Sequence, residues 1–171
     1  NILFQSPSPI QEKDTTGSLH DRLAVDAAQA LITCLPKIAA GALQGIEQRE
    51  ENVTYAPKIT RSERWLDWTR PGVELVRQIR AFNPRPLART ALGDQIILVQ
   101  QAALGPVYQD EYPGTVMQAR EGLIRVQTGD GSLELCEIQL PGGRPLGSRD
   151  FLNGFPLTPG QRFQSADYAQ T

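Results

Sequence analysis

The stretch from Arg77 to Pro86 (Arg-Gln-Ile-Arg-Ala-Phe-Asn-Pro-Arg-Pro) ends one kind of secondary structure and begins another. The apolar residues before and within it recur three positions apart, at Val73, Val76, Ile79 and Phe82. This spacing predicts a helix over residues 71–82 with one apolar stripe. Pro84 and Pro86 lack a backbone N–H and cannot continue the helix, and the residues before them favour extended conformations. We therefore predict that a stiff turn leads from this helix into strands.

Four arginines surround the turn, at positions 77, 80, 85 and 89. Cations near a helix C-terminus complement its partial negative charge, so an ordinary helix end is one interpretation. The charge of the chain is also unevenly spread: residues 1–51 carry −3, residues 58–89 carry +5 and residues 90–171 carry −4. A basic middle in an acidic chain favours a polyanion as ligand. A solvated charged face, with Arg80 paired to Glu74, Asp67 or a barrel carboxylate, explains the same pattern.

The composition is that of a soluble globular protein, with 171 residues, of which 40% are hydrophobic and 21% charged. No apolar run is long enough to span a bilayer, and no signal peptide is visible. Because the sequence begins with Asn1, we expect a processed chain or a fragment. Cys34 and Cys136 lie among apolar residues and are expected to be buried free thiols in a reducing, cytoplasmic compartment. The one histidine, His20, predicts no zinc site, and nothing nearby supports a catalytic triad built on it.

The first forty residues predict one strand followed by one helix. Residues 1–5 have strand character, and Asp14-Thr-Thr-Gly17 supplies capping side chains for a helix start. An apolar stripe then runs through Leu19, Leu23, Ala27, Ala30, Leu31, Cys34, Leu35 and Ile38. We expect one long helix, or two in line, that ends at Ala40-Gly41, with Pro36 as a kink or as the first turn of a second piece. One strand and one helix cannot bury this stripe, so the unit resembles the tail of a larger domain. Its exposed apolar surface is expected to self-associate.

The rest of the chain predicts a linker and a β-rich domain. Residues 45–69 are polar except for a few apolar side chains, and their two tryptophans indicate an ordered strap packed on a surface. The domain over residues 70–171 begins with the helix at 71–82. Five strands are predicted to follow, at 86–91, 95–103, 114–120, 122–128 and 132–140, with a break near Cys136 that suggests a bulge. A short helix is predicted at 148–153. This order predicts an α+β chain whose main part is an OB-like barrel.

A series of motifs in this order resembles the C-terminal part of the bacterial methionyl-tRNA formyltransferase family. The motifs are Val53-Thr-Tyr-Ala-Pro-Lys58-Ile, Trp65-Leu-Asp-Trp68, Ile79-Arg-Ala-Phe-Asn-Pro-Arg-Pro86, Pro113-Gly-Thr-Val116, Thr128-Gly-Asp-Gly131, Leu152-Asn-Gly154 and Pro159-Gly160. Each is weak alone, but seven in order cover nearly the whole chain. Asp14-Thr-Thr-Gly-Ser-Leu19 resembles the start of the last helix of the family's catalytic domain.

The resemblance implies that three parts of the chain have different roles. Residues 1–44 would be the remnant of a Rossmann-like catalytic domain, residues 45–69 the linker and residues 70–171 the OB-like domain. The family transfers a formyl group from 10-formyltetrahydrofolate to the amino group of methionyl initiator tRNA. No position here matches its catalytic asparagine, histidine and aspartate motif, so this chain is expected to be inactive alone and to bind no cofactor or metal.

What the resemblance carries over is contact with tRNA. Lys58 matches a linker lysine that the family would place near the tRNA, and Arg80 and Arg85 match the motif at the helix end. Clustering of charge adds Arg61, Arg64 and Arg89 as candidates. These side chains would neutralise phosphates, which gives affinity and salt dependence without base specificity.

Two alternatives belong to other functional classes. In a sugar-nucleotide formyltransferase or a formyltetrahydrofolate dehydrogenase, a similar C-terminal domain would support the catalytic domain structurally. A barrel that serves only in contact with other proteins is the second alternative. The linker and the Pro113-Gly-Thr-Val116 turn fit the tRNA enzyme better.

Overall fold

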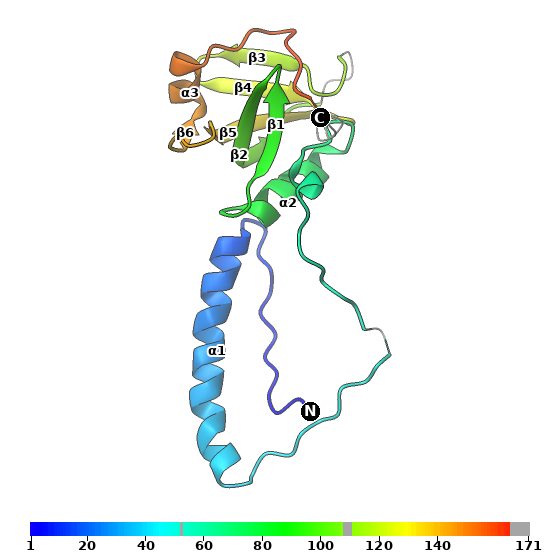
Figure 1. Cartoon of the computed structure of the whole chain (residues 1–171), viewed down its shortest axis with the longest axis vertical. Helices are drawn as coiled ribbons and strands as arrows, with labels where there is room; N and C mark the ends of the chain where they lie inside the picture. The colour runs from blue at the N-terminus through cyan, green and yellow to red at the C-terminus, as the bar shows by residue number, and fades with distance from the viewer. Residues whose placement is uncertain (52, 108–110, 165–171) are drawn as a thin grey trace. The chain divides into compact units, whose positions relative to one another are not determined.

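The computed structural model describes residues 1–51, 53–107 and 111–164. Contacts within the chain divide it into two compact units, Asn1–Lys58 and Ile59–Thr171 (Figure 1). The first contains one long helix, and the second contains short helices and an antiparallel sheet. The predicted α+β class is confirmed.

The first unit is built on α1, Thr16–Ala39. Thr15 is its N-cap and forms a capping box with Ser18, as the run of polar residues before the helix predicted. The helix is continuous through Pro36 and is followed by Gly41, whose φ of +64° suits a residue without a side chain. The prediction of a strand over residues 1–5 is wrong. These residues make only an isolated bridge, between Ile2 and Ile46, because the described part of this unit offers no further strand for them to pair with.

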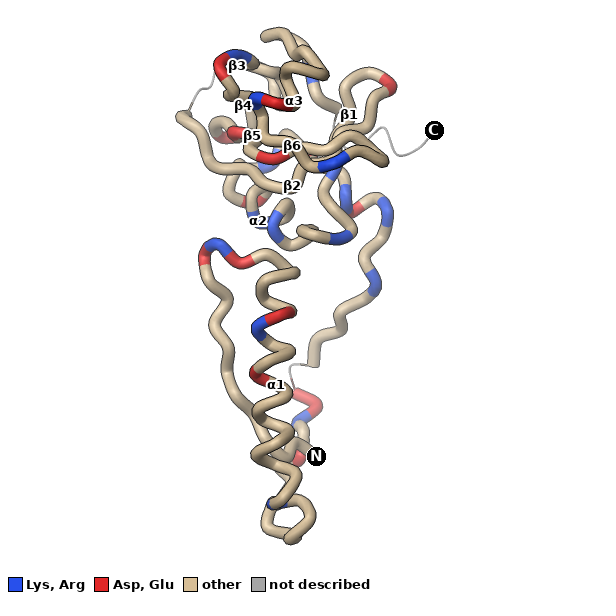
Figure 2. Tube along the Cα trace, turned by 90° about the vertical axis from the view of Figure 1, so that its left-hand side faces the viewer, with Lys and Arg blue, Asp and Glu red and all other residues tan. Residues whose placement is uncertain are grey.

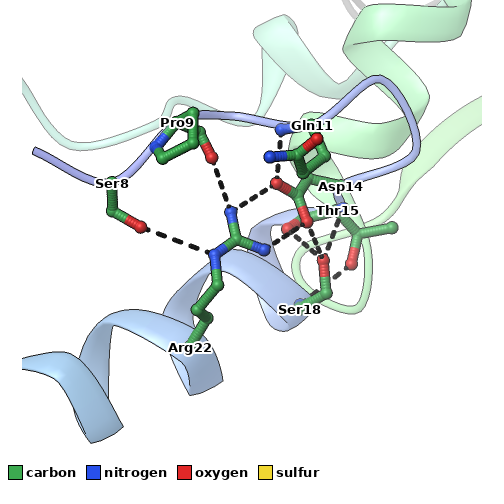
Figure 3. A network of polar contacts seen from close by, with 7 residues as sticks. All are labelled: Ser8, Pro9, Gln11, Asp14, Thr15, Ser18 and Arg22. Carbon is green, nitrogen blue, oxygen red and sulfur yellow. Dashed lines mark hydrogen bonds and ion pairs between the residues drawn. The ribbon is translucent and has the colours of Figure 1, made fainter.

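The start of α1 is held by an ion pair that lies beneath the preceding loop (Figure 3). The Arg22 guanidinium donates to both carboxylate oxygens of Asp14, at 2.9 and 2.6 Å, and to the carbonyl oxygen of Pro9 at 2.9 Å. Asp14 also accepts from the Gln11 amide and the Ser18 hydroxyl, at 2.7 and 3.0 Å. The Asp14 side chain is only 8% exposed. These donors, of which Arg22 is the strongest, hold the pKa of Asp14 well below its usual range.

The apolar stripe of α1 lies largely at the surface. Cys34 is buried, but the large side chains at positions 23, 25, 31, 32, 35 and 38 are all exposed. The expectation that this unit cannot cover its own apolar face is therefore confirmed within residues 1–51 and 53–58.

The second unit contains one antiparallel sheet. Its strands are β1 (Ala88–Leu92), β2 (Gln95–Leu104), β3 (Val116–Arg120), β4 (Leu123–Gln127), β5 (Ser132–Gln139) and the two-residue β6 (Leu146–Gly147). The strand order is β1-β2-β5-β4-β3, and β6 pairs with β5. The five predicted strands are confirmed to within two residues at each end. The tight turn between β3 and β4 requires positive φ at Glu121 and Gly122, as in a two-residue hairpin.

The register confirms the predicted irregularity near Cys136. Opposite β2, the pairing shifts on both sides of Gln101, and Cys136 has no partner in the ladder. Both cysteines are free, as predicted. Cys136 is half-buried, however, and not fully buried as expected, because the bulge displaces it from the core face. Partial burial and the nearby Glu134 carboxylate raise the pKa of its thiol.

The segment at 160–164 joins the two outer strands of the sheet. Its Phe163 amide donates to Gly114 just before β3, and its Gln164 amide donates to Ala91 in β1, both at 2.8 Å. Because β1 and β3 stand at opposite ends of the strand order, these bonds connect the sheet edges (Figure 1). The predicted closure of the sheet therefore has a structural basis, whereas the OB-like assignment stays a prediction.

Residues 65–68, which we call the tryptophan strap, are part of the core of this unit. Leu66 and Trp68 are fully buried, and Trp65 is 5% exposed. The Trp68 indole N–H donates to the Thr90 hydroxyl at 3.0 Å, and that hydroxyl donates to the Gln164 carbonyl oxygen at 3.0 Å. Trp65, Leu66 and Trp68, which the sequence predicts to pack on a surface within the linker 45–69, are instead buried in the compact unit that begins at Ile59.

Two helices complete the second unit, α2 (Gly72–Phe82) and α3 (Ser148–Gly154), and both agree closely with their predicted ranges. α2 buries Leu75 and Ile79 against the sheet. Its first amide, that of Gly72, donates to the Asp130 carboxylate at 2.7 Å, so the Thr128-Gly-Asp-Gly131 loop caps the helix. Gly129 of that loop lies against the backbone carbonyl of Thr69, where a side chain would clash.

The first testable prediction concerns the Asp14–Arg22 pair. Because the pKa of Asp14 is lower in the folded chain, the ion pair stabilises α1 above the ordinary carboxylate pKa of about 4, and the stabilisation is lost as the pH falls below that value. Asp14→Asn is expected to lower the stability of the first unit at pH 7 and to lower it by a smaller amount near pH 2, where part of the stabilisation by the ion pair has already been lost. Circular dichroism unfolding curves at the two pH values measure this. Asp21→Asn, on an exposed side chain, is the control, and an Asp14→Asn effect that does not change with pH would contradict the assignment.

Candidate nucleic-acid interface

The six predicted contact residues are divided between the two units. Lys58 is exposed at the end of the first unit, whereas the five arginines, at positions 61, 64, 80, 85 and 89, belong to the second. Figure 2 shows Lys and Arg recurring on α2 and on the segment that leads into it. The second unit itself therefore brings cations from η1 (the 3-10 helix Ser62–Arg64), α2 and β1 into one region of its sequence and fold.

Arg64 is anchored to the chain that follows the proline turn. Its Nε donates to the Leu87 carbonyl oxygen at 3.2 Å, and its Nη2 donates to the Pro86 carbonyl oxygen at 2.5 Å. Leu87 has a φ of +63°, and its amide donates to the Phe82 carbonyl oxygen at 2.9 Å. The carbonyl groups of Pro86 and Leu87 precede the first paired residue of β1, Ala88. Arg64 therefore supplies hydrogen bonds to this turn, and part of its role is structural.

Arg89 is fixed by an aromatic ring and by a backbone carbonyl. Its guanidinium carbon lies 4.4 Å from the centre of the Trp65 ring, within the range of a cation–π interaction. Its Nη2 donates to the Arg61 carbonyl oxygen at 3.0 Å. Trp65 and Arg89 also form a parallel backbone bridge, and the Leu66 amide donates to the Arg89 carbonyl oxygen at 2.9 Å. These contacts bring Arg61, Arg64 and Arg89 together although they come from distant parts of the chain.

The charges of these three arginines are not balanced by carboxylates. None of the ion pairs in the described part of the chain includes Arg61, Arg64 or Arg89. Partial burial lowers the pKa of Arg89, and the charges of Arg64 and Arg61 lower it further. The repulsion identifies the three guanidinium groups as neighbours, in a region where an anion would be stabilised.

Arg80 and Arg85 lie at the end of α2 and in the turn. Glu74, which the sequence offered as a partner for Arg80, pairs with Arg70 at 2.6 Å, and no ion pair of Arg80 is found among the described residues. Arg80 is half-buried, and its Nε has no hydrogen-bond partner there. Arg85 is exposed. Asn83 ends the helix in an extended conformation, as the following proline requires, and its side-chain Nδ2 donates to the Gln100 carbonyl oxygen at 2.7 Å.

No group of three or more His, Cys, Asp or Glu side chains in residues 1–51, 53–107 and 111–164 is arranged to hold a metal ion. His20 is exposed, and its ring contacts Asp21 at 3.3 Å.

The helices in residues 1–51, 53–107 and 111–164 are all too short or too polar to cross a membrane.

Trp65 belongs to this site although the sequence does not predict it. Two tryptophans in a polar segment indicated packing, and Trp68 packs as expected. The contact of Trp65 with Arg89 depends on a bridge between distant segments, for which the sequence carries no local signal.

The geometry predicts that the arginines differ in their effect on stability. Arg64→Ala removes two charge-assisted hydrogen bonds to backbone carbonyl groups and is expected to lower the free energy of unfolding by about 1–3 kcal/mol. Arg85→Ala, on an exposed side chain, is expected to change it by less than about 0.5 kcal/mol. Denaturant unfolding of the two variants makes the comparison. Equal effects would show that the Arg64 contacts contribute nothing.

Comparison with known proteins finds similarity to the C-terminal parts of proteins named formyltransferase. The family model described as "Formyl transferase, C-terminal domain" matches residues 58–156. Two curated proteins named methionyl-tRNA formyltransferase are similar. The one from Nitrosococcus oceani is 43% identical over 93% of this chain and 50% of its own length, and the one from Halorhodospira halophila is 41% identical over 95% and 53%. The chain thus spans about half the length of the curated relatives it matches.

Solved structures of HypX from Aquifex aeolicus have a similar fold. A variant of that protein superposes with a TM-score of 0.65 at 19% identity, covering 86% of this chain and 27% of HypX. A second HypX structure, in complex with tetrahydrofolic acid, gives a TM-score of 0.58 at 18% identity and covers 81% and 26%. Since the family model matches more than half of the residues, the chain belongs to the family of formyl transferase C-terminal domains.

Proposed function

We propose that this chain is the C-terminal part of a methionyl-tRNA formyltransferase. The observation that carries the proposal is the identity of 38–43% to proteins of that name over most of the chain. The whole enzyme transfers a formyl group from 10-formyltetrahydrofolate to the amino group of methionyl initiator tRNA. This reaction belongs to translation initiation, which in bacteria occurs in the cytoplasm.

In this proposal the chain contributes tRNA binding, and the catalytic groups come from another part of the enzyme. Residues 1–44 complete the catalytic domain, residues 45–69 are the linker, and residues 70–171 form the OB-like domain. The folate co-substrate binds outside this chain.

The proposed contacts act through charge. Three of the six cations are exposed, namely Lys58, Arg61 and Arg85. The other three, Arg64, Arg80 and Arg89, are half-buried. Each cation that neutralises a phosphate releases bound counterions, so affinity falls as salt rises. Such contacts position the RNA but do not read its sequence, and selection of the initiator tRNA therefore needs other parts of the enzyme.

The proposal is tested by replacing Lys58, Arg80 and Arg85 together with glutamine in the complete enzyme. The variant is expected to raise KM for methionyl initiator tRNA and to flatten the dependence of log K on log salt by about 0.9 for each lost contact with paired RNA, as for duplex DNA. Formylation kinetics and filter binding at several salt concentrations measure both quantities. Arg144→Gln, on an exposed arginine outside residues 58–89, is the control. Unchanged formylation would favour the alternative in which this domain only supports the catalytic domain.

We also propose that the chain, when separated from the rest of the enzyme, self-associates through α1. Leu31, Ile32 and Leu35 are 56%, 64% and 52% exposed, and contiguous apolar surface of this kind favours association. Leu31→Gln with Leu35→Gln is expected to shift the chain toward monomer in sedimentation velocity runs. Leu104→Gln, at a side chain 58% exposed in the second unit, is the matched control. A wild-type chain that remains monomeric at all concentrations would contradict this proposal.

A further inference from the structure

Arg61, Arg64 and Arg89 differ from the other basic residues because protein contacts gather them on one support. The support is the bridge between residue 65 and β1, reinforced by the Leu66 amide bond to Arg89. Arg89 lies over the Trp65 ring, and its bond to the Arg61 carbonyl group brings the Arg61 backbone to the same place. Arg64 is held by the carbonyl groups of residues 86 and 87, which come just before β1.

The contacts leave donors free on each guanidinium group. A guanidinium carries five N–H donors. Arg64 uses its Nε and Nη2 atoms, and Arg89 uses Nη2, in bonds to backbone oxygens. The Nη1 atoms of both side chains have no hydrogen bond among the described residues, and the Arg61 guanidinium has none at any nitrogen. Free donors from three side chains therefore occupy one small region.

None of the three arginines pairs with a carboxylate among the described residues. Glu63, the nearest acidic residue in sequence, accepts from the Thr60 amide and hydroxyl at 2.6 and 2.7 Å, and these bonds lower its pKa. Glu74 and Glu134 pair with Arg70 and Arg125. The three guanidinium groups therefore lack a partner carboxylate in the described part of the chain, and an oxyanion is a ligand that would supply the opposite charge.

We propose that Arg61, Arg64 and Arg89 form a discrete phosphate subsite on the Trp65 support. Arg64 and Arg89 are held in place by the fold, whereas the Arg61 side chain closes over the bound phosphate group. The ligand class is a phosphodiester or phosphate oxyanion bound by forked N–H donors. The subsite deepens the tRNA-binding role proposed above, and its identification with an RNA phosphate rests on that role. Binding of free phosphate does not depend on it.

Titration of the chain with inorganic phosphate at constant ionic strength tests the subsite, with the arginine Nε–Hε signals followed by NMR. Saturable shifts are expected for the Arg64 and Arg89 signals, and Arg61→Gln is expected to weaken the affinity about tenfold or more, as for the loss of one charge-assisted hydrogen bond. Arg61 suits this test because its side chain has no partner among the described residues, and the carbonyl group that Arg89 uses remains in the variant. Arg77→Gln, on an exposed arginine of α2, is the matched control and is expected to change nothing.

Two results would overturn the inference: shifts that rise linearly without saturation, or equal weakening by Arg61→Gln and Arg77→Gln. A second titration, with a diribonucleoside monophosphate, shows whether a phosphodiester also binds there. If phosphate binds as expected but the glutamine variants at 58, 80 and 85 leave formylation unchanged, the subsite stands and the tRNA role fails. If formylation falls but no saturable phosphate binding is seen, the tRNA role stands and the subsite fails.

Discussion

The buried hydroxyl group of Thr90 connects three segments on which the second unit depends. It accepts from the Trp68 indole and donates to the Gln164 carbonyl oxygen, and so it joins the tryptophan strap, β1 and the segment that links the sheet edges. Trp68 also stacks on Phe163, with ring centres 5.8 Å apart. An unsatisfied buried polar group costs about 1–3 kcal/mol. Displacement of the strap would leave the Thr90 hydroxyl without its donor and would therefore destabilise the sheet. The strap holds Trp65, and Trp65 supports Arg89.

This dependence explains how the chain tolerates three neighbouring arginines, none of which forms an ion pair among the described residues. Repulsion between guanidinium groups at a surface amounts to about 1 kcal/mol or less, since solvent screens it. The same segment buries Leu66 and Trp68 completely, and full burial of one large apolar side chain contributes about 1.5–3 kcal/mol. Apolar burial therefore outweighs the repulsion. The positive charge that results is a stable property of the fold rather than a consequence of loose surface side chains.

The strands, the helices and the free cysteines could be predicted because their signals are local. Alternation in residues 123–127 and the prolines at 84 and 86 act on adjacent residues, and the structure follows them closely. The strand at residues 1–5 failed because a strand needs a partner, which its own sequence does not describe. Burial of the tryptophan strap, and the contacts of Arg64 and Arg89, depend on pairing between distant segments. Composition therefore identified the basic region but not which of its arginines are fixed.

The distinction between fixed and free arginines bears on how a polyanion would bind. Ordering a long side chain costs about 0.5–1.5 kcal/mol at an interface. For Arg64 and Arg89 that cost is met on folding, because backbone carbonyl groups and the Trp65 ring already hold them. Lys58 and Arg85 are exposed and have no such contacts among the described residues, so they suit long-range attraction. The preorganised pair of Arg64 and Arg89 would fix the position of one phosphate group, whereas the exposed cations would pay the cost of ordering when the polyanion binds.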